Sequence, residues 1–305
     1  MVAGACDCHT HVFGPRADYP MVDARHYTPG PAPLAALRAH LAGLGLERVV
    51  LVQPSVYGTD NRCMLDALAR LDGAGRGIVV LEDGVDAAAL RELHARGVRG
   101  VRINLESAGL RDIAGARALL QAWSARVADL GWHVQLYAAQ PVVQALADDL
   151  ARLPSSVVLD HFALADVMPG GDALTDLLRT GCVHVKLSAP YRLASPALGG
   201  AWARHWVDAV PGALLWASDW PHTARGPGRA AHEVSAYRAI PANGLRQEIA
   251  RWLPSAELRR RVLARIFHRS RATNEYGIAL VCPKIQVSNL DQRAGNAEAK
   301  LYRRN

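Results

Sequence analysis

Short apolar runs rich in Val, Leu and Ile alternate along this chain with stretches of helical periodicity. This alternation indicates a sheet of parallel strands, because parallel neighbours are joined by crossover connections that are usually helical. The apolar runs number eight, at 5–11, 48–53, 77–81, 100–104, 133–137, 157–161, 184–188 and 214–219. Helical spacing is found between them, for instance over 34–44, 64–71, 87–96, 113–130, 142–153 and 173–179.

Eight strand–helix units over about 250 residues match the size and repeat of a (β/α)8 barrel. We therefore predict an α/β fold, a single TIM-barrel domain at residues 1–270. A doubly wound sheet is the alternative. Such a sheet usually carries a Gly-rich strand-to-helix turn after an early strand, and this sequence has none.

The end of the chain differs in composition from the rest. From residue 285 onward Asn, Gln, Lys and Ser replace the earlier Ala, Arg, Leu and Gly, and helical periodicity is lost. Because such segments are typically loosely ordered, we assign 271–305 to an atypical C-terminal tail without a catalytic role. The abrupt change also raises the hypothesis of a reading-frame shift near residue 266, which translation of the encoding DNA in the alternative frame would test.

Composition excludes several classes of protein. The chain of 305 residues is 50% hydrophobic, which is enough to bury a large core and excludes disorder as its main state. Its 35 Lys and Arg residues outnumber 28 Asp and Glu residues, for a net charge of +7. The positive charge is almost all arginine, scattered among acidic residues rather than gathered in one block, so we predict no nucleic-acid partner.

Cysteine usage and the first residues bear on location. Five cysteines, an odd number in a long chain, argue against the disulfide framework of small secreted proteins. Met1 to Ala5 lack the basic flank of a secretory signal, and no apolar run approaches the length of a membrane span. We therefore predict a cytoplasmic protein without a membrane partner. No oligomeric state is predicted.

Polar side chains recur where the predicted strands end. A barrel of this kind carries its chemistry at the C-terminal ends of its strands, whereas its interior is filled by apolar layers. The polar residues at these ends are His9, His11, Gln53, Ser55, Arg102, Asn104, Gln135, Tyr137, Asp160, His161, Lys186, Arg192, Asp219 and His222.

The first predicted strand contains two histidines two residues apart. Side chains of a strand alternate between its faces, so the pattern places Asp7, His9 and His11 on one face and Cys8 and Thr10 on the other. Both imidazoles are then expected to point into the mouth of the barrel. Their spacing suits two ligands of one metal ion or two hydrogen-bond donors that meet on one substrate oxygen.

Asp219 closes the last apolar strand between two tryptophans, Trp216 and Trp220. A carboxylate in such low-dielectric surroundings can act as a general base toward water, with a pKa set by desolvation against nearby imidazoles such as His161. The alternative is that Asp219 is the N-cap of the next helix.

Other strand-end residues suit substrate binding. Arg102 and Arg192 are candidates to hold a substrate carboxylate, because guanidinium groups bind carboxylates bidentately. Ser55 lacks the Gly-x-Ser-x-Gly turn of a nucleophile and follows Pro54, so a hydrogen bond to substrate is the role we expect of it.

Seven segments carry a more specific signal when taken in order. They are DCHTHVFGP (7–15), LVQPSVYGTDN (51–61), GVRGVRIN (97–104), WHVQLY (132–137), DHF (160–162), VKLSAPYR (185–192) and WASDWPH (216–222). Together they resemble the amidohydrolase superfamily, in the branch that contains 2-pyrone-4,6-dicarboxylate hydrolase and related sugar-lactone hydrolases and isomerases.

The resemblance implies a hydrolase that opens a lactone or cyclic ester of a carboxylated or sugar-derived small molecule. Asp219 would deprotonate the attacking water. The groups implied to polarise the carbonyl are His9, His11 and His161. The groups implied to hold the substrate are Arg102, Arg192, Tyr137 and Ser55.

The sequence also departs from the superfamily's patterns. Metal-dependent members often supply a strand-4 lysine or a strand-5 histidine, where this chain has Arg102 and the pair Gln135 and Tyr137. The resemblance therefore implies catalysis without a cofactor. If one divalent metal such as zinc is bound, its ligands would be His9, His11, His161 and Asp219.

A further departure concerns the substrate. The resemblance implies a basic residue shortly after the Arg-x-Asn of strand 4, as in the pyrone dicarboxylate hydrolase. This chain has Leu-Glu-Ser-Ala-Gly there, at 105–109. A monocarboxylate or sugar lactone is therefore expected rather than a dicarboxylate. The alternatives are a lactone isomerase, a zinc-dependent decarboxylase of the same superfamily, and a barrel that only binds a ligand.

Overall fold

The computed structural model describes residues 2–106, 112–170, 173–225 and 228–264, together with the backbone of 267–269 and 276–278. Apart from that backbone, the tail assigned to 271–305 lies outside the described residues, as does the point near residue 266 where a frame shift was hypothesised.

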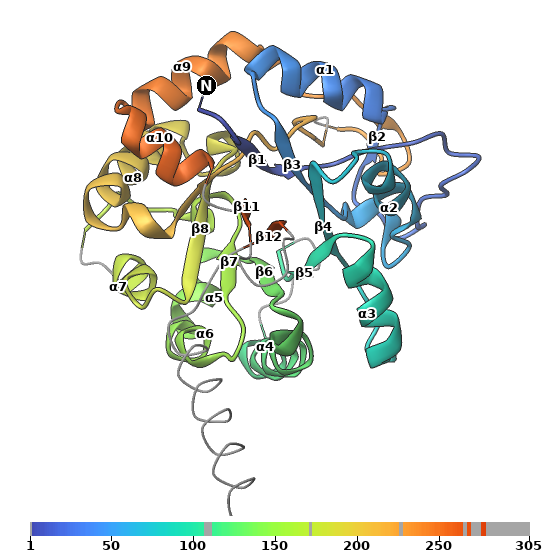
Figure 1. Ribbon diagram of the computed structural model, residues 1–305, viewed down its shortest axis with the longest axis horizontal. Coiled ribbons are helices and arrows are strands. Elements are labelled where there is room, and N and C mark those ends of the chain that lie inside the picture. Colours follow the sequence, from blue (N-terminus) through green and yellow to red (C-terminus); the bar gives the residue numbers. More distant parts are fainter. Residues whose placement is uncertain are drawn as a thin grey trace, which may run out of the picture.

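Eight parallel strands follow one another around the sheet in chain order, with helices outside them (Figure 1). All eight predicted strands are found, and their sequential order confirms the TIM barrel and excludes the doubly wound alternative, whose strand order reverses. The strands are β1 (Cys6–Thr10), β3 (Arg48–Val52), β4 (Gly75–Val79), β5 (Val98–Asn104), β6 (His133–Tyr137), β7 (Val157–Leu159), β8 (Val183–Leu187) and β9 (Leu214–Trp216).

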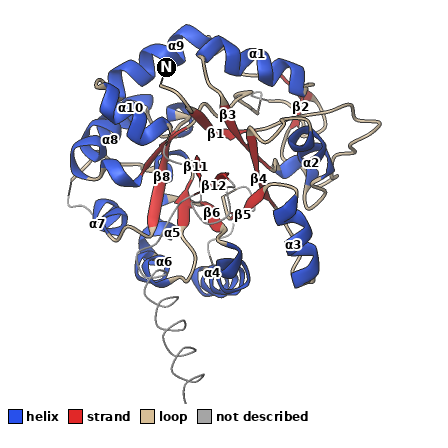
Figure 2. Ribbon diagram, viewed as in Figure 1, coloured by secondary structure: helices blue, strands red, loops and turns tan. Residues whose placement is uncertain are grey.

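The helices surround the strands as an outer layer (Figure 2). Two pairs of short strands lie apart from the barrel sheet, β2 (Thr28–Pro29) with β10 (Val234–Ser235), and β11 (Phe267–Arg269) with β12 (Tyr276–Ile278). The helices are α1 (Leu34–Leu44), α2 (Arg62–Ala69), α3 (Ala87–Ala95), α4 (Ile113–Val127), α5 (Gln140–Ala145), α6 (Ala147–Arg152), α7 (Ala173–Arg179), α8 (Pro196–Ala209), α9 (Ala242–Trp252) and α10 (Ala256–Leu263).

Local sequence explains where several helices begin and end. The side chains of Asp86, Asp112, Ser195 and Ser255 accept hydrogen bonds from backbone N–H groups in the first turns of α3, α4, α8 and α10. These N–H groups have no partner within the helix, so a capping oxygen stabilises each start. Helix α1 ends at Gly45, whose φ of 68° suits a residue without a Cβ atom.

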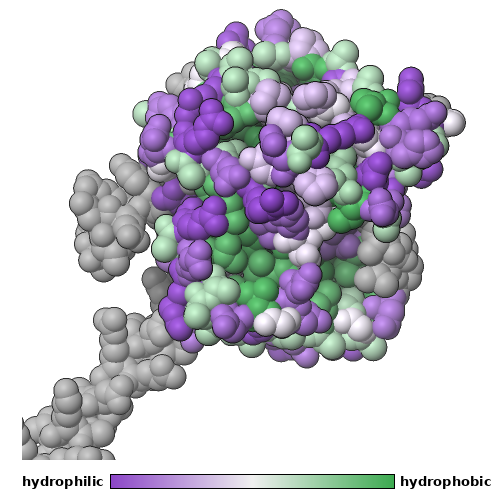
Figure 3. Space-filling model, turned by 90° about the vertical axis from the view of Figure 1, so that its right-hand side faces the viewer, coloured by the Kyte–Doolittle hydropathy of each residue, from purple (hydrophilic) through white to green (hydrophobic). Residues whose placement is uncertain are grey.

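Two apolar layers fill the molecule. The larger lies between the strands and the helices and includes Leu37, Trp123 and Trp206. In the side view of Figure 3, hydrophilic residues make up most of the outer surface, and hydrophobic residues show through in the recesses between them. The smaller layer comes from inward-facing strand positions and contains Cys6, Cys8, Val50, Val52, Ile78, Val158, Leu215 and Ala217.

The barrel is closed by contacts between β1 and the residues that follow β9. The Asp219 N–H donates to the His9 carbonyl at 3.1 Å, and the His11 N–H donates to the Trp220 carbonyl at 2.9 Å. The Ser218 N–H donates to Asp7 Oδ1 at 2.9 Å. Closure therefore brings His9 of β1, and His11 directly after it, beside Asp219.

A bulge interrupts β1. Between Asp7 and Thr10 the strand advances three residues while its partner β3 advances two, from Val49 to Leu51. Cys8 belongs to the inner layer, whereas Asp7 Oδ2 lies 3.5 Å from His40 Nε2 of helix α1. The predicted face shared by Asp7, His9 and His11 is therefore wrong for Asp7, because the bulge turns the strand over after it.

The described residues contain no helix that is both long enough and apolar enough to cross a membrane.

Candidate active site

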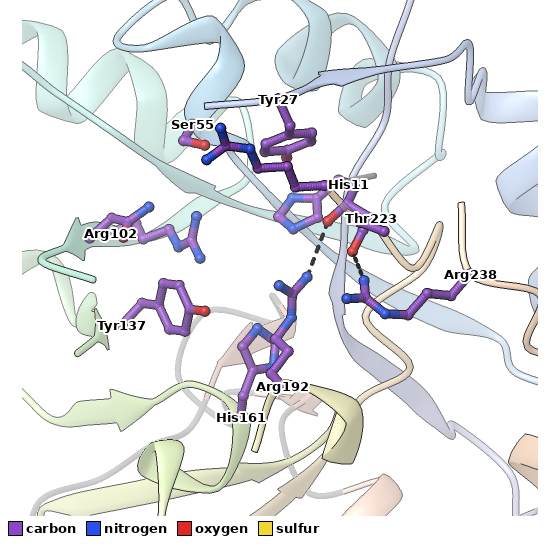
Figure 4. A pocket seen from close by; sticks show the side chains of 12 residues that line it. His11, Tyr27, Ser55, Arg102, Tyr137, His161, Arg192, Thr223 and Arg238 are labelled. Carbon is purple, nitrogen blue, oxygen red and sulfur yellow. Dashed lines mark hydrogen bonds between the residues drawn. The ribbon is translucent and has the colours of Figure 1, made fainter. Parts of the chain in front are cut away.

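A cavity of about 330 Å³ opens at the C-terminal ends of the strands (Figure 4). Six of the eight predicted site residues line it, and His9 and Asp219 lie fully buried beside them. The cavity is lined by His11, Tyr27, Ser55, Arg102, Asn104, Tyr137, His161, Arg192, Thr223, Ala224, Arg225 and Arg238.

His9 of β1 and His11, which follows the strand, contact each other through their Nε2 atoms, which are 3.2 Å apart. His11 Nδ1 lies 2.7 Å from the carbonyl oxygen of Val52. Since a carbonyl only accepts hydrogen bonds, His11 carries a proton on Nδ1. A neutral His11 therefore turns the lone pair of its Nε2 toward His9.

The two oxygens of Asp219 have different surroundings. Oδ2 accepts hydrogen bonds from the Tyr191 hydroxyl at 2.8 Å and from Arg192 Nε and Nη2 at 2.9 and 2.6 Å. Oδ1 accepts none from the described residues. It lies 3.7 Å from Nε2 of His9, and 3.8 Å from Nε2 of both His11 and His161. One oxygen is anchored and the other is available to a reactant.

Backbone conformation aims both Asp219 and His161 at this point. Asp219 has a φ of 62°, and the four residues from His161 to Leu164 have φ between 47° and 56°. Left-handed backbone is unfavourable for residues with a Cβ atom and is often found at functional sites. Asp219 is not the cap of a helix, since the next helix, α9, begins at Ala242.

Burial keeps the imidazoles of the site neutral. It lowers the pKa of His11 to about 4 and that of His161 to about 3, because the charged form loses its hydration. The pKa of His9 is also lowered well below its usual value, by burial and then by the charge of Lys186. At neutral pH all three rings are therefore uncharged.

Asp219 is ionised despite its burial. Burial alone would raise the pKa of this carboxyl, but the charge of Arg192 brings it below its usual value. A carboxylate with one unpaired oxygen and neutral imidazoles around it can accept a proton from water.

A charged cluster lies beneath the histidines, and of its members only Arg102 was predicted to have a role in the site. Lys186 Nζ is 3.1 Å from Asp160 Oδ1 and donates to Gln135 Oε1 at 2.7 Å. Asp160 Oδ2 accepts from Gln135 Nε2 at 3.1 Å and from Arg102 Nη2 at 3.3 Å. The signal available in the sequence was that these polar residues alternate with apolar ones in β6 and β8, as inward-facing positions do.

Sequence reasoning also missed part of the cavity wall. Tyr27, Thr223, Arg225 and Arg238 lie in loops and not at strand ends, so the pattern of strand ends could not find them. In Figure 4 Arg192 and Arg238 both reach Thr223. The Arg238 guanidinium carbon also lies 4.5 Å from the ring centroid of Tyr191.

The histidines and Asp219 also form a donor set for a divalent ion. Ligand atoms of His9, His11 and Asp219 all lie within 4.8 Å of one another. Asp219 Oδ1 is buried and accepts no hydrogen bond from the described part of the chain. Imidazole nitrogens and a carboxylate oxygen are ligands that zinc takes in proteins, so these residues fit a zinc ion.

Comparison with known proteins agrees with this architecture. Residues 6–268 match the Amidohydrolase family. The chain is 36% identical over 280 residues to a 2-pyrone-4,6-dicarboxylate hydrolase of Comamonas testosteroni, which covers 86% of this chain and 88% of that protein. It is 32% identical over 276 residues to a 4-sulfomuconolactone hydrolase of Hydrogenophaga intermedia, with coverage of 86% and 87%.

A solved structure of a proposed 2-pyrone-4,6-dicarboxylic acid hydrolase from Pseudomonas putida has a TM-score of 0.69 at 34% identity, covering 87% of this chain and 96% of that one. The match thus extends over most of both chains, and it includes all of the strands whose ends form the cavity. This chain belongs to the amidohydrolase family.

Proposed function

We propose that this amidohydrolase is a lactonase-type hydrolase that opens a lactone or cyclic ester bearing an anionic group. The proposal is carried by one observation, the unpaired Oδ1 of the Asp219 carboxylate among three imidazoles beside an arginine-lined cavity. The lactone hydrolases among the relatives support the reaction class.

Asp219 acts as the general base in this proposal. Its Oδ1 accepts a proton from water, and the water oxygen attacks the carbonyl carbon of the ring. Nε2 of His9 and of His161 lies within 3.8 Å of Oδ1, so an N–H on either nitrogen polarises a carbonyl placed close to the base, whereas His11 offers its Nε2 lone pair and acts by holding His9. Collapse of the tetrahedral oxyanion breaks the ring C–O bond, and the leaving oxygen takes the proton back from Asp219. The product is the ring-opened hydroxy acid.

Guanidinium and hydroxyl groups hold the substrate. Arg102, Arg192, Tyr137 and Ser55 line the cavity and can orient a carboxylate and the ring oxygens. Arg102 pairs with Asp160 and Arg192 with Asp219, so a substrate carboxylate shares these guanidinium groups with carboxylates already present.

No basic residue occurs at 105–109, where a second anionic group of the substrate was expected to need one, but the cavity has positive charge elsewhere. Arg225 and Arg238 line it from the loop after β9, and they give a second anionic group a place to bind. This supports extending the predicted substrates from monocarboxylates to lactones with two anionic groups.

A zinc ion held by His9, His11, His161 and Asp219 would polarise a carbonyl and acidify water. The steps proposed above need only the side chains of the chain itself, and they use these same four residues.

The proposal is tested on a panel of sugar lactones, pyrone carboxylates and muconolactones, by following proton release with and without a chelator. Chelator-resistant ring opening that Asp219→Asn abolishes supports hydrolysis by the side chains alone. Activity that a chelator removes and zinc restores supports hydrolysis but assigns the polarising role to the metal. Loss of CO2, isomerisation without proton release, or no turnover on any compound would overturn the proposal.

A further inference from the structure

The ammonium group of Lys186 is enclosed by three acceptors. Lys186 is 2% exposed, on β8. Its Nζ lies 2.7 Å from Gln135 Oε1, 3.1 Å from Asp160 Oδ1 and 3.1 Å from His9 Nδ1. An ammonium group has three N–H donors and no acceptor, so these three contacts account for all of its hydrogen bonds.

The ring of His9 can carry its proton on either nitrogen, and the two positions have different consequences. With the proton on Nδ1, Asp160 Oδ1 at 3.2 Å would accept the N–H, but the Lys186 ammonium at 3.1 Å would face that N–H and have one of its own N–H groups without an acceptor. The lone pairs on Nε2 of His9 and His11 would also face each other across 3.2 Å. Both arrangements are unfavourable in a buried site.

With the proton on Nε2, every donor in the cluster has an acceptor. Lys186 donates to His9 Nδ1, and the His9 Nε2–H donates to His11 Nε2. The proton of His11 is on Nδ1, where the Val52 carbonyl accepts it at 2.7 Å. The hydrogen bonds then run in one direction, from Lys186 through both imidazoles to the backbone of β3.

We propose that Lys186 is a positioning residue that holds the proton of His9 on Nε2, so that the nitrogen on the side of the cavity carries an N–H and withholds the lone pair that a metal ion needs. A metal-ligating histidine usually donates its second N–H to a carboxylate or carbonyl. Asp160 Oδ1, at 3.2 Å from His9 Nδ1, is placed to accept such a bond, so Asp160 favours a proton on Nδ1 and Lys186 opposes it.

This inference rests on the proposed function and deepens it, because polarisation of a lactone carbonyl needs an N–H donor, and the His9 Nε2–H that His11 accepts in the free site can pass to a bound carbonyl. Lys186 thereby favours catalysis by the His9 side chain over binding of zinc by the same side chain. The spectra and metal titrations that test it require no substrate, so its failure and the failure of lactone hydrolysis can be told apart.

The position of the proton is measured directly by two-bond ¹⁵N–¹H correlation spectra of the protein labelled in its histidines, with the His9 signals identified by comparison with His9→Asn. We expect His9 to carry its proton on Nε2 in the wild type, and Nδ1 to become protonated in Lys186→Met. His11 is an internal control, because its Nδ1 proton is held by Val52 and should stay in place.

Gln135→Met is the matched control. It removes another buried polar partner of Lys186 and Asp160 that has no hydrogen bond to His9, so the His9 proton should remain on Nε2. A wild-type spectrum with the proton on Nδ1 would overturn the proposal without any variant. Equal changes in Lys186→Met and Gln135→Met would overturn it too, because they would show general disturbance of the cluster.

Zinc affinity gives a second readout. Competition with a chromogenic chelator should show zinc binding at least about tenfold tighter in Lys186→Met than in the wild type and in Gln135→Met, since outer partners of a ligand commonly change affinity by about 10–100-fold. Equal affinity in all three proteins would contradict the proposal. If Lys186→Met does not fold, Lys186→Gln takes its place, and the wild-type spectrum still decides the position of the proton.

Discussion

The guanidinium of Arg192 donates two hydrogen bonds to Asp219, from Nε at 2.9 Å and from Nη2 at 2.6 Å, and both end on Oδ2. The same guanidinium lines the cavity, where an anionic substrate can reach it. Arg192 thus connects substrate binding with the basicity of the residue that we propose activates water.

Replacing Arg192 should change the pH profile of the reaction. The charge of Arg192 lowers the pKa of Asp219, so Arg192→Met should raise that pKa and move the acid limb of kcat/KM to higher pH. KM should rise as well, because an anionic substrate loses a guanidinium. The control is Arg204→Met, at an exposed position on α8. An unchanged acid limb would argue against Asp219 as the base.

Asp219→Asn should separate catalysis from binding. The amide retains the shape of the side chain but cannot accept a proton from water, so kcat should fall by about 10²–10⁴-fold. Substrate affinity, measured by calorimetry, should change much less, since Asp219 is buried and the cavity is lined by other residues. A variant that keeps most of its kcat would assign the base to another group.

Arg238→Met should distinguish substrates by their number of anionic groups. Arg238 lines the cavity and lies over the ring of Tyr191. A hydrogen bond to a charged group contributes about 1.5–3 kcal/mol, so KM for a lactone with two anionic groups should rise by about tenfold or more. KM for a lactone with one should stay nearly constant. Equal changes for both would remove Arg238 from substrate selection.

Stability should fall as the pH is lowered from 7 toward 4. Burial lowers the pKa of His133 to about 3 and of His222 to about 4, in addition to the lowered values of His9, His11 and His161. Between these values and the ordinary histidine pKa, the unfolded chain binds protons that the folded chain does not. Each such histidine therefore reduces the free energy of unfolding by up to about 1.4 kcal/mol per pH unit.

Urea unfolding at a series of pH values measures this slope. His133 lies in the barrel interior and lines no part of the cavity, so His133→Asn should make the slope shallower by one histidine's share. A free energy of unfolding that is constant between pH 7 and 5 would contradict the prediction.

Asp7→Ala should weaken the closure of the barrel. Asp7 Oδ1 accepts from the backbone N–H groups of Ser218 and His9, at 2.9 and 3.3 Å. A buried donor left without an acceptor costs about 1–3 kcal/mol, so the free energy of unfolding should fall by at least that amount. Asp208→Ala, at an exposed position on α8, is the control. Equal stability of the two variants would show that closure does not depend on Asp7.

The strands were predictable because their apolar runs are local properties of the sequence. Residues 133–137 were predicted as a strand and form β6 with the same bounds. The strand predicted at 77–81 is found two residues earlier, at Gly75–Val79, because Gly75 and Arg76 pair with β3 although neither is apolar. Hydrogen bonding to the neighbouring strand determined where this strand starts. The local pattern of apolar residues carries no information about that neighbour.

Site residues at strand ends were predictable from the sequence. Contacts between side chains of adjacent strands were missed. His11, His161 and Arg102 line the cavity as predicted. Asp160 and Lys186 are 26 residues apart in sequence. They form an ion pair only because β7 and β8 are adjacent. Two buried charges with no partner nearby in the sequence give no local sign that they neutralise each other.

The place where the barrel closes is also the place where His9 and Asp219 meet, and these residues come from opposite ends of the described barrel. During synthesis on the ribosome, His9 emerges first and Asp219 follows only after the eighth strand of the barrel. A partly synthesised chain therefore cannot contain the complete active site. Catalytic activity of this protein therefore requires the complete barrel. Fragments that fold as half-barrels would have no activity.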